Sequence, residues 1–409
     1  MTSLRSLPDH EPIDQALVLW FAQPRSATGE DVLEIHHHGS LAVRDLLLNS
    51  IALVPGCRPA EAGEFSKRAF MNGKLDLVEL EGLADLIDAT TRDQAQQAVR
   101  QLDGELSQRF ERWRTQIVEL LAFTEAIIDF GDEEGDVADT STTAWRDKVE
   151  VLHDDMLQFL NDGRRGERLR DGLKLVVMGP PNAGKSSLIN KLAKRDVAIV
   201  DAEAGTTRDA IAVDLEIAGV PVTLMDTAGL RQSANRVEAE GIRRTWQHAG
   251  QADIILALVD GSSGLQGAIK HALHDDQVII SVVNKIDLMG PTQIAPNLGI
   301  PISCKSGAGL DTLWDEIERT VTDIAGLRSD QPLALTNIRH RQLLEQAAAA
   351  LEPLLQGGGR GENTVKVQAD SALMSEQLRL CARALGQISG RVTVDDVLDV
   401  IFQRFCIGK

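Results

Sequence analysis

The chain has 409 residues, of which 43% are hydrophobic, so it is long enough for two or three domains with packed cores. Its formal net charge of −19 argues against broad, non-specific binding to nucleic acid, which depends on basic surfaces, although a local basic patch is compatible with it. Its four cysteines lack C-x-x-C spacing, so neither a disulfide framework nor a zinc knuckle is expected. The sequence has no membrane-length apolar run and no secretory signal, which predicts a cytoplasmic protein.

Residues 1–73 mix strand-like and helix-like patterns. The runs 16–21 and 32–36 have the character of strands, and 42–53 is helix-like. We therefore expect a small α/β domain over residues 1–73. The three histidines at 36–38 are weak candidates for a metal site, because neighbours on a strand point to opposite faces, and a strand end in a polar turn is the preferred interpretation.

Residues 74–171 have a helical pattern. The acidic stretch 129–139 is expected to be a loop between two helices. Apolar residues recur at helical spacing at Leu80, Leu83, Ala84 and Ile87, and again at Ile117, Leu120 and Leu121.

Residues 179–186, G-P-P-N-A-G-K-S, match the phosphate-binding pattern G-x-x-x-x-G-K-[ST] at every fixed position. The match follows a strand-like run at 173–178 and precedes a helix-compatible segment at 187–192, which is the context that such a loop requires. Glycines let the backbone wrap phosphates, and the lysine adds a positive charge. The sequence therefore predicts a nucleotide site with contacts from Asn182, Ala183, Gly184, Lys185, Ser186 and Ser187.

Four further motifs follow in the order that a guanine-nucleotide switch protein needs. G-T-T-R-D at 205–209 offers a threonine hydroxyl to phosphate-bound Mg²⁺, and D-T-A-G at 226–229 follows a strand-like run at 220–225. N-K-I-D at 284–287 follows the run 278–283, and its final carboxylate can accept two N–H groups that guanine has and adenine lacks. S-C-K at 303–305 follows the short strand 300–302 and can close over the base.

This order along the chain makes GTP the expected nucleotide and ATP unlikely, with the site at the carboxyl ends of the strands. The further expected contacts are Asp201, Ala202, Glu203, Ala204, Gly205, Thr206, Thr207, Asp226, Thr227, Ala228, Gly229, Asn284, Lys285, Ile286, Asp287, Ser303, Cys304 and Lys305.

Leu230 occupies the position after D-T-A-G at which Ras-like proteins carry a glutamine that orients the attacking water. Hydrolysis is therefore either poor or assisted by another group. Asn182 and the loop 201–206 can line an oxygen-rich pocket for a monovalent cation where an arginine finger would otherwise act, with a loop-capping amide as the alternative for the asparagine. Glu238 and Glu240 are candidates for orienting the water, and a solvated charged surface is the alternative for each.

Residues 329–409 return to a helical pattern, with a flexible break expected at the glycines 357–359. Neither this segment nor 74–171 looks large enough to bury its apolar faces alone. We therefore expect a single helical domain, split into 74–171 and 329–409, with the nucleotide domain 172–328 inserted. The expected fold is α/β plus α: a Ras-like P-loop GTPase domain in a split helical domain, preceded by the small α/β domain.

The motifs together resemble the MnmE family of tRNA-modifying GTPases, also called TrmE, over nearly the whole chain. The marks of the family are T-G-E-D-V-L-E at 28–34, G-E-F-S-K-R-A-F at 63–70 and N-G-K-L-D-L at 72–77. P-N-A-G-K-S-S, A-G-T-T-R-D and D-T-A-G-L-R follow in the nucleotide domain, and the chain ends with F-C-I-G-K at 405–409. This ending is the most specific mark, because generic GTPases lack it.

The resemblance implies GTP hydrolysis controlled by dimerisation of the nucleotide domains. It further implies Mg²⁺ held by Ser186 and Thr207, and a water molecule oriented by Glu238. It implies that K⁺ takes the place of an arginine finger, held by Asn182, Asp201, Glu203 and Thr206.

The resemblance also implies a homodimer that joins the flavoprotein MnmG, also called GidA, in a heterotetramer acting on tRNA. The reaction adds a carboxymethylaminomethyl-type group to C5 of the wobble uridine. A 5-formyl-tetrahydrofolate-type folate is implied at the N-terminal domain, with contacts from Glu34, Lys74 and Lys409. For Cys406 in the same tail, a structural thiol and a redox or catalytic role are both open.

The chain departs from the family pattern before Ala16. Family members usually carry a longer start with a G-R-G-G segment and an R-I-S-G strand that supplies a folate-contacting arginine, and neither is present here. The resemblance therefore predicts a shortened N-terminus. Two alternative functions are a ribosome-assembly GTPase, which would need a basic RNA-binding appendage, and a non-hydrolysing GTP-dependent scaffold, which Leu230 would allow.

Overall fold

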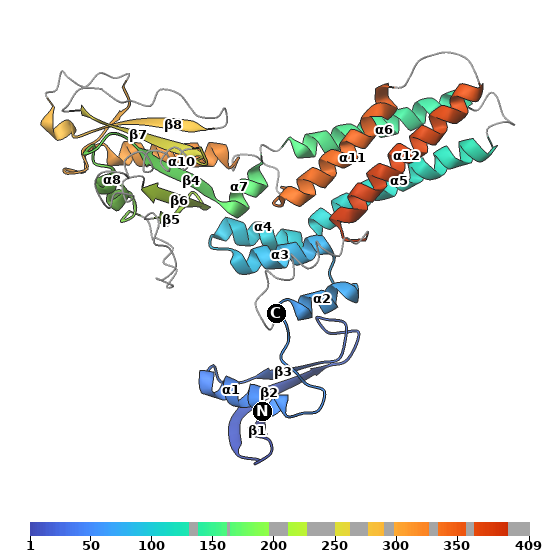
Figure 1. Ribbon diagram of the computed structural model, residues 1–409, viewed down its shortest axis with the longest axis horizontal. Coiled ribbons are helices and arrows are strands. Elements are labelled where there is room, and N and C mark those ends of the chain that lie inside the picture. Colours follow the sequence, from blue (N-terminus) through green and yellow to red (C-terminus); the bar gives the residue numbers. More distant parts are fainter. Residues whose placement is uncertain are drawn as a thin grey trace, which may run out of the picture. The chain divides into compact units, whose positions relative to one another are not determined.

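The computed structural model describes residues 1–130, 138–161, 164–195, 212–226, 250–261, 277–289, 298–326, 334–356 and 364–391 (Figure 1). These residues form two compact units. The first takes its described residues from Met1–Ile87, Ala98–Asp154 and Leu343–Lys409, and the second from Asp88–Gln97 and Asp155–Gln342. Each unit is therefore assembled from segments that are distant in the sequence.

The first unit begins with a three-stranded antiparallel sheet in the order β1-β2-β3, with β1 at Thr2–Arg5, β2 at Pro12–Phe21 and β3 at Val32–His36. Helix α1, Leu41–Ala52, packs against β2. The predicted strands at 16–21 and 32–36 and the predicted helix at 42–53 are confirmed. Strand β1 was not predicted, because it is short and largely polar.

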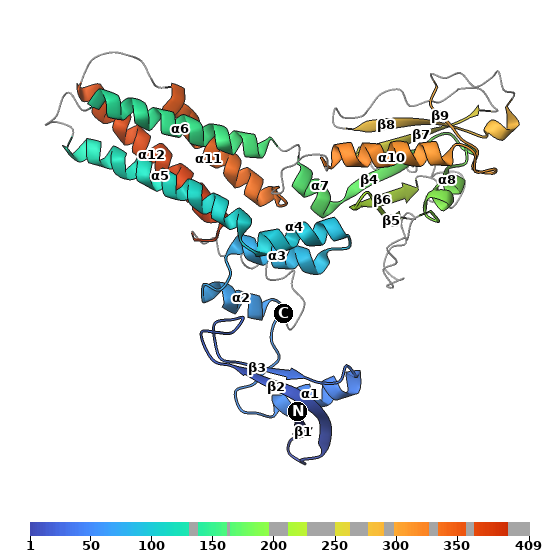
Figure 2. The same cartoon turned by 180° about the vertical axis from the view of Figure 1, so that it is seen from behind.

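Helices make up the rest of the first unit. Helices α5 and α12 lie side by side in both views although they are far apart in the sequence (Figures 1 and 2), and an ion pair between Arg379 and Glu125 at 2.8 Å links them. The helices that lie wholly or partly in this unit are α1, α2 (Glu64–Met71), α3 (Leu77–Asp88), α4 (Arg92–Leu102), α5 (Glu105–Phe130), α6 (Ala138–Leu160), α11 (Ile338–Gln356) and α12 (Thr364–Ile388).

The acidic stretch 129–139, predicted to be a loop, is helical at both of its described ends. Helix α5 continues to Phe130, and α6 already begins at Ala138. Residues 131–137 and the glycines 357–359 lie outside the described part of the chain.

The second unit is built on a six-stranded sheet in the order β5-β6-β4-β7-β8-β9. All neighbouring strands are parallel except β5, which pairs with β6 in an antiparallel hairpin. The strands are β4 (Leu173–Met178), β5 (Ala212–Ile217), β6 (Val220–Asp226), β7 (Ile254–Asp260), β8 (Val278–Asn284) and β9 (Ile300–Pro301).

The helices α7 (Arg165–Asp171), α8 (Lys185–Leu192) and α10 (Leu310–Ile324) belong to the second unit. Apolar faces of α8 and α10 join the strands in one core, with Leu188, Leu256 and Ile317 fully buried. The strands predicted at 173–178, 220–225, 278–283 and 300–302 are confirmed, and the helix predicted at 187–192 begins two residues earlier. The fold class, α/β plus α, is therefore as expected. No helix among the described residues is long and apolar enough to cross a membrane.

Candidate nucleotide site

The phosphate loop connects β4 to α8, and its conformation depends on Gly184. This glycine has a left-handed φ of 100°, and a Cβ at this position would meet Nδ2 of Asn284. Helix α8 starts at the next residue, so the N–H groups of its first turn point towards the loop. Nζ of Lys185 donates to the carbonyl oxygens of Gly179 at 2.9 Å and Pro180 at 3.0 Å. The lysine thus spans the loop on which phosphates are expected.

Asn284, the first residue of the N-K-I-D motif, ties two loops together. Its Nδ2 donates to the carbonyl oxygen of Ala183 in the phosphate loop at 2.8 Å. Its Oδ1 accepts from the backbone N–H of Cys304 at 3.1 Å, and only 2% of its surface is exposed. Because both ends of this buried amide are satisfied, it fixes the distance between the phosphate loop and the S-C-K loop.

Asp287, the last residue of the same motif, is held by Ser303. The Ser303 hydroxyl donates to Asp287 Oδ1 at 2.6 Å and accepts from the backbone N–H of Ser306 at 3.1 Å. Ser303 is fully buried, whereas Asp287 is exposed. The carboxylate is therefore presented at the surface in a fixed orientation. Burial raises the pKa of the neighbouring Cys304 thiol, so this cysteine stays protonated and unreactive.

Lys285, between these two residues, pairs with a residue that the motifs do not include. Its Nζ lies 2.7 Å from Oδ2 of Asp260, the last residue of β7. Asp260 follows the uninterrupted apolar run 254–259, which is the pattern of a buried parallel strand. A polar residue directly after such a run lies where ligands bind, and this position is the sequence signal for Asp260.

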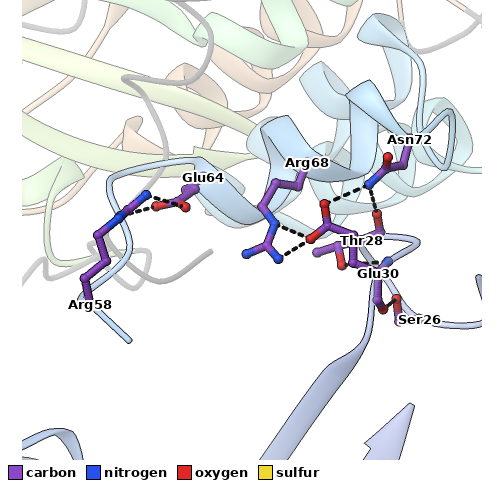
Figure 3. Close-up of polar contacts among 7 residues, drawn as sticks. All are labelled: Ser26, Thr28, Glu30, Arg58, Glu64, Arg68 and Asn72. Carbon is purple, nitrogen blue, oxygen red and sulfur yellow. Dashed lines mark hydrogen bonds and ion pairs between the residues drawn. The ribbon is translucent and has the colours of Figure 1, made fainter. Parts of the chain in front are cut away.

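A second polar network lies in the N-terminal region and holds the loop between β2 and β3 against α2 (Figure 3). The carboxylate of Glu30 accepts from Arg68, at 2.6 Å from Nε, and from Asn72 at 3.3 Å. Asn72 also donates to the Thr28 carbonyl oxygen at 2.9 Å, and the Ser26 hydroxyl donates to the Glu30 carbonyl oxygen. The hydrogen bonds from Arg68 and Asn72 lower the pKa of Glu30 below its usual value. Figure 3 also shows Arg58 bound to both oxygens of Glu64.

The two described residues of the predicted folate site have separate partners. Lys74 Nζ donates to the Pro24 carbonyl oxygen at 3.0 Å, and the exposed Glu34 contacts His36 at 3.1 Å. The predicted strand end at the three histidines is confirmed, because β3 ends at His36 and His38 pairs with Asp14. Among the described residues, no cluster of three or more His, Cys, Asp or Glu side chains could hold a metal ion.

The structure brings the phosphate loop, N-K-I-D and S-C-K together at one edge of the sheet. Of the predicted Mg²⁺ and K⁺ ligands it describes Ser186 and Asn182, both exposed and both on or beside the phosphate loop. The predicted residues that lie outside the described part of the chain are Asp201, Ala202, Glu203, Ala204, Gly205, Thr206, Thr207, Thr227, Ala228, Gly229, Leu230, Glu238, Glu240, Cys406 and Lys409, together with the side chain of Asp226.

Comparison with known proteins gives matches along the whole chain. A family model described as the MnmE helical domain matches residues 77–406, and one described as the N-terminus of the GTP-binding protein TrmE matches residues 1–74. The tRNA modification GTPase MnmE of Parvibaculum lavamentivorans is 47% identical over 401 residues, which cover 98% of this chain and 88% of that protein.

A mitochondrial protein of Rattus norvegicus, the 5-taurinomethyluridine-[tRNA] synthase subunit GTPB3, is 44% identical over 416 residues, which cover 98% of this chain and 82% of that protein. Among solved structures, a crystal structure of Era from Aquifex aeolicus is 25% identical, covers 44% of this chain and 66% of that chain, and has a TM-score of 0.29.

Proposed function

The chain belongs to the MnmE family of tRNA modification GTPases, and from this premise we propose that it is a K⁺-dependent GTP hydrolase that serves the modification of certain tRNAs. With a flavoprotein partner of the MnmG type, it takes part in adding a carboxymethylaminomethyl-type group to C5 of the wobble uridine. Family membership leaves the alternative of a ribosome-assembly GTPase without support.

The observation that carries the proposal is the link that Asn284 makes between the phosphate loop and the S-C-K loop. A guanine nucleotide needs a phosphate cradle and a base-reading carboxylate at a fixed separation. The buried side-chain amide of Asn284 sets this separation, and the Ser303 hydroxyl holds the carboxylate of Asp287. The exposed carboxylate can accept the two N–H groups of guanine, which makes the base specificity a property of this edge of the sheet.

During hydrolysis the chain's own residues bind the phosphates and orient the water. Backbone N–H groups of the phosphate loop and the ammonium group of Lys185 stabilise the negative charge that builds up on the phosphate oxygens. Glu238 orients the attacking water in place of the missing glutamine. Ser186 and Thr207 would hold Mg²⁺, while Asn182, Asp201, Glu203 and Thr206 would hold K⁺. The exposed oxygen donors of Ser186 and Asn182 suit such hard cations, which when bound neutralise charge on the transferring phosphoryl group.

The remaining parts of the chain are proposed to transmit and use this cycle. We infer a nucleotide domain at 172–328, inserted in a helical domain made of 74–171 and 329–409, because α5 and α12 pack together from both sides of the insertion. Residues 1–73 are proposed to bind a folate through Glu34 and Lys74, with Lys409 from the C-terminal tail, and to form the homodimer. The partner flavoprotein and tRNA would complete the assembly.

We expect GTP turnover to be faster in K⁺ than in Na⁺ at equal ionic strength by about tenfold or more, because a bound cation supplies charge that an arginine finger would otherwise supply. Phosphate release at saturating GTP and Mg²⁺ measures the two rates. Asn182→Ala should remove the advantage of K⁺, whereas Asp214→Asn on β5, at the other end of the sheet, should retain it. Equal and negligible rates in both salts would contradict the cation mechanism and favour a non-hydrolysing scaffold.

Glu238→Ala is expected to keep GDP affinity unchanged and to lower turnover about 10²- to 10³-fold, since it removes only the group that orients the water. Binding by calorimetry and phosphate release under single-turnover conditions separate the two effects. The matched control is Glu240→Ala, two residues further along, which should turn over GTP within about twofold of the unchanged protein. Unchanged turnover in Glu238→Ala would remove Glu238 from this role.

A further inference from the structure

Asp260 and Lys285 form an ion pair between the ends of two neighbouring parallel strands. β7 ends at Asp260 and β8 ends at Asn284, and these two residues lie opposite each other in the register. Lys285 follows directly, and its Nζ lies 2.7 Å from Asp260 Oδ2. Because β4 is parallel to β7, the pair lies at the same edge of the sheet as the phosphate loop.

The environment of the pair favours a stable contact. The side chain of Asp260 is 13% exposed and that of Lys285 is 31% exposed, so the contact is partly shielded from water. A hydrogen bond between two charged groups is shorter and stronger than one between neutral groups. The backbone of Lys285 has a φ of 66°, which is uncommon for a residue other than glycine. Both the backbone and the side-chain end of this lysine are therefore held in defined positions.

Each of the other two polar residues of the N-K-I-D motif is held by a partner of its own. Asn284 is held by the Ala183 carbonyl oxygen and the Cys304 N–H, and Asp287 by the Ser303 hydroxyl. Lysine has a long, flexible side chain and would lose much conformational freedom if it became ordered only when a nucleotide bound. The carboxylate at the end of β7 removes this freedom beforehand.

We propose that Asp260 is a positioning residue for guanine nucleotides: it holds Lys285 in the orientation that the bound nucleotide requires. Asp260 acts through Lys285 and does not itself touch the nucleotide. Pre-organisation of this kind raises affinity without adding a contact to the ligand. The inference rests on the proposed nucleotide site and adds to it a residue that the GTP-binding motifs do not contain.

The test is a double-mutant cycle on the full chain, with the Kd for GDP in the presence of Mg²⁺ measured by calorimetry. Asp260→Asn keeps the size of the side chain and removes its charge, and we expect the Kd to rise about tenfold. In a Lys285→Met background the same change should alter the Kd by less than about twofold, because the residue through which Asp260 acts is gone. A purely structural role would weaken binding to the same extent in both backgrounds.

Asp214→Asn is the matched control. Asp214 lies in β5, the edge strand at the far end of the strand order, and accepts a hydrogen bond from Thr223 of β6 at 2.8 Å. This variant should leave the Kd unchanged. Asp260→Glu keeps the charge and should bind GDP within about threefold of the unchanged protein; Asp260→Ser serves the cycle if Asp260→Asn does not fold. Unchanged affinity in Asp260→Asn, or an equal loss in both backgrounds, overturns the role of Asp260 but leaves the proposed nucleotide site in place. Failure of the unchanged protein to bind GDP overturns the proposed nucleotide site as well.

Discussion

Gly184→Ala is expected to weaken GDP binding about 100-fold. The residue has a φ of 100°, which costs an alanine about 1–2 kcal/mol, and the added methyl group would meet Nδ2 of Asn284. Asn284 must then move, and its bonds to Ala183 and Cys304 weaken by about 1 kcal/mol each. The free variant can relieve this strain by leaving the binding conformation, so GDP binding must restore it, and a total near 3 kcal/mol corresponds to about two powers of ten in Kd. Calorimetric titration with GDP and Mg²⁺ measures the change.

Gly56→Ala, in the other compact unit, is a control for the stability that alanine costs at a positive φ without steric conflict. Gly56 has a comparable φ of 85°, but no atom lies within 4 Å of the position that its Cβ would take. This variant should show a small loss of thermal stability and unchanged GDP affinity. A Gly184→Ala protein that stays folded and binds GDP within about threefold of the unchanged protein would show that the contact with Asn284 does not control the loop.

Most strands of the nucleotide unit could be predicted because each ends in a motif. An apolar run precedes each of four motifs, the phosphate loop, D-T-A-G, N-K-I-D and S-C-K, and the motif marks the carboxyl end of that run. The structure has strands at these four runs: β4, β6, β8 and β9. β7 is equally apolar, but no nucleotide motif follows it, and a short apolar run alone is compatible with a buried helix or strand.

β5 was missed for a different reason. It joins β6 through a tight hairpin in which Ala218 and Gly219 have φ values of 52° and 81°, as a two-residue turn of this hand requires. Asparagine or aspartate followed by glycine is the usual signal for such a turn, and alanine in the first position concealed it. Pairing with β6 outweighs the poor fit of alanine to a positive φ.

The motifs predicted which residues belong to the site but not how they hold one another. Asn284 and Ala183 are 101 positions apart, and no local pattern encodes the bond between them. The same is true of Lys285 and Asp260, which meet only because β7 and β8 are neighbours in register. Strand order therefore had to be known before Asp260 could be recognised.

Asp287→Asn is expected to lower the affinity for GTP about 100-fold and to make xanthosine triphosphate the preferred ligand. The carboxylate accepts two N–H groups from guanine, whereas an amide offers only one acceptor and adds an N–H donor. Xanthine carries an oxygen in the place of the guanine amino group and can accept from this donor. Competition of both nucleotides against a fluorescent GDP analogue measures the switch, and unchanged preference for GTP would show that Asp287 does not read the base.

The switch depends on the orientation of the new amide, which Ser303 sets. The Ser303 hydroxyl accepts from the Ser306 N–H, so its own proton is directed towards position 287, where it requires an acceptor. The oxygen of the introduced amide must therefore face Ser303, and its NH₂ group then faces the base. Ser303→Ala in the Asp287→Asn background should lower the preference for xanthosine triphosphate about tenfold, because the amide can turn over. If the preference survives, Ser303 orients neither the amide nor, by the same geometry, the native carboxylate.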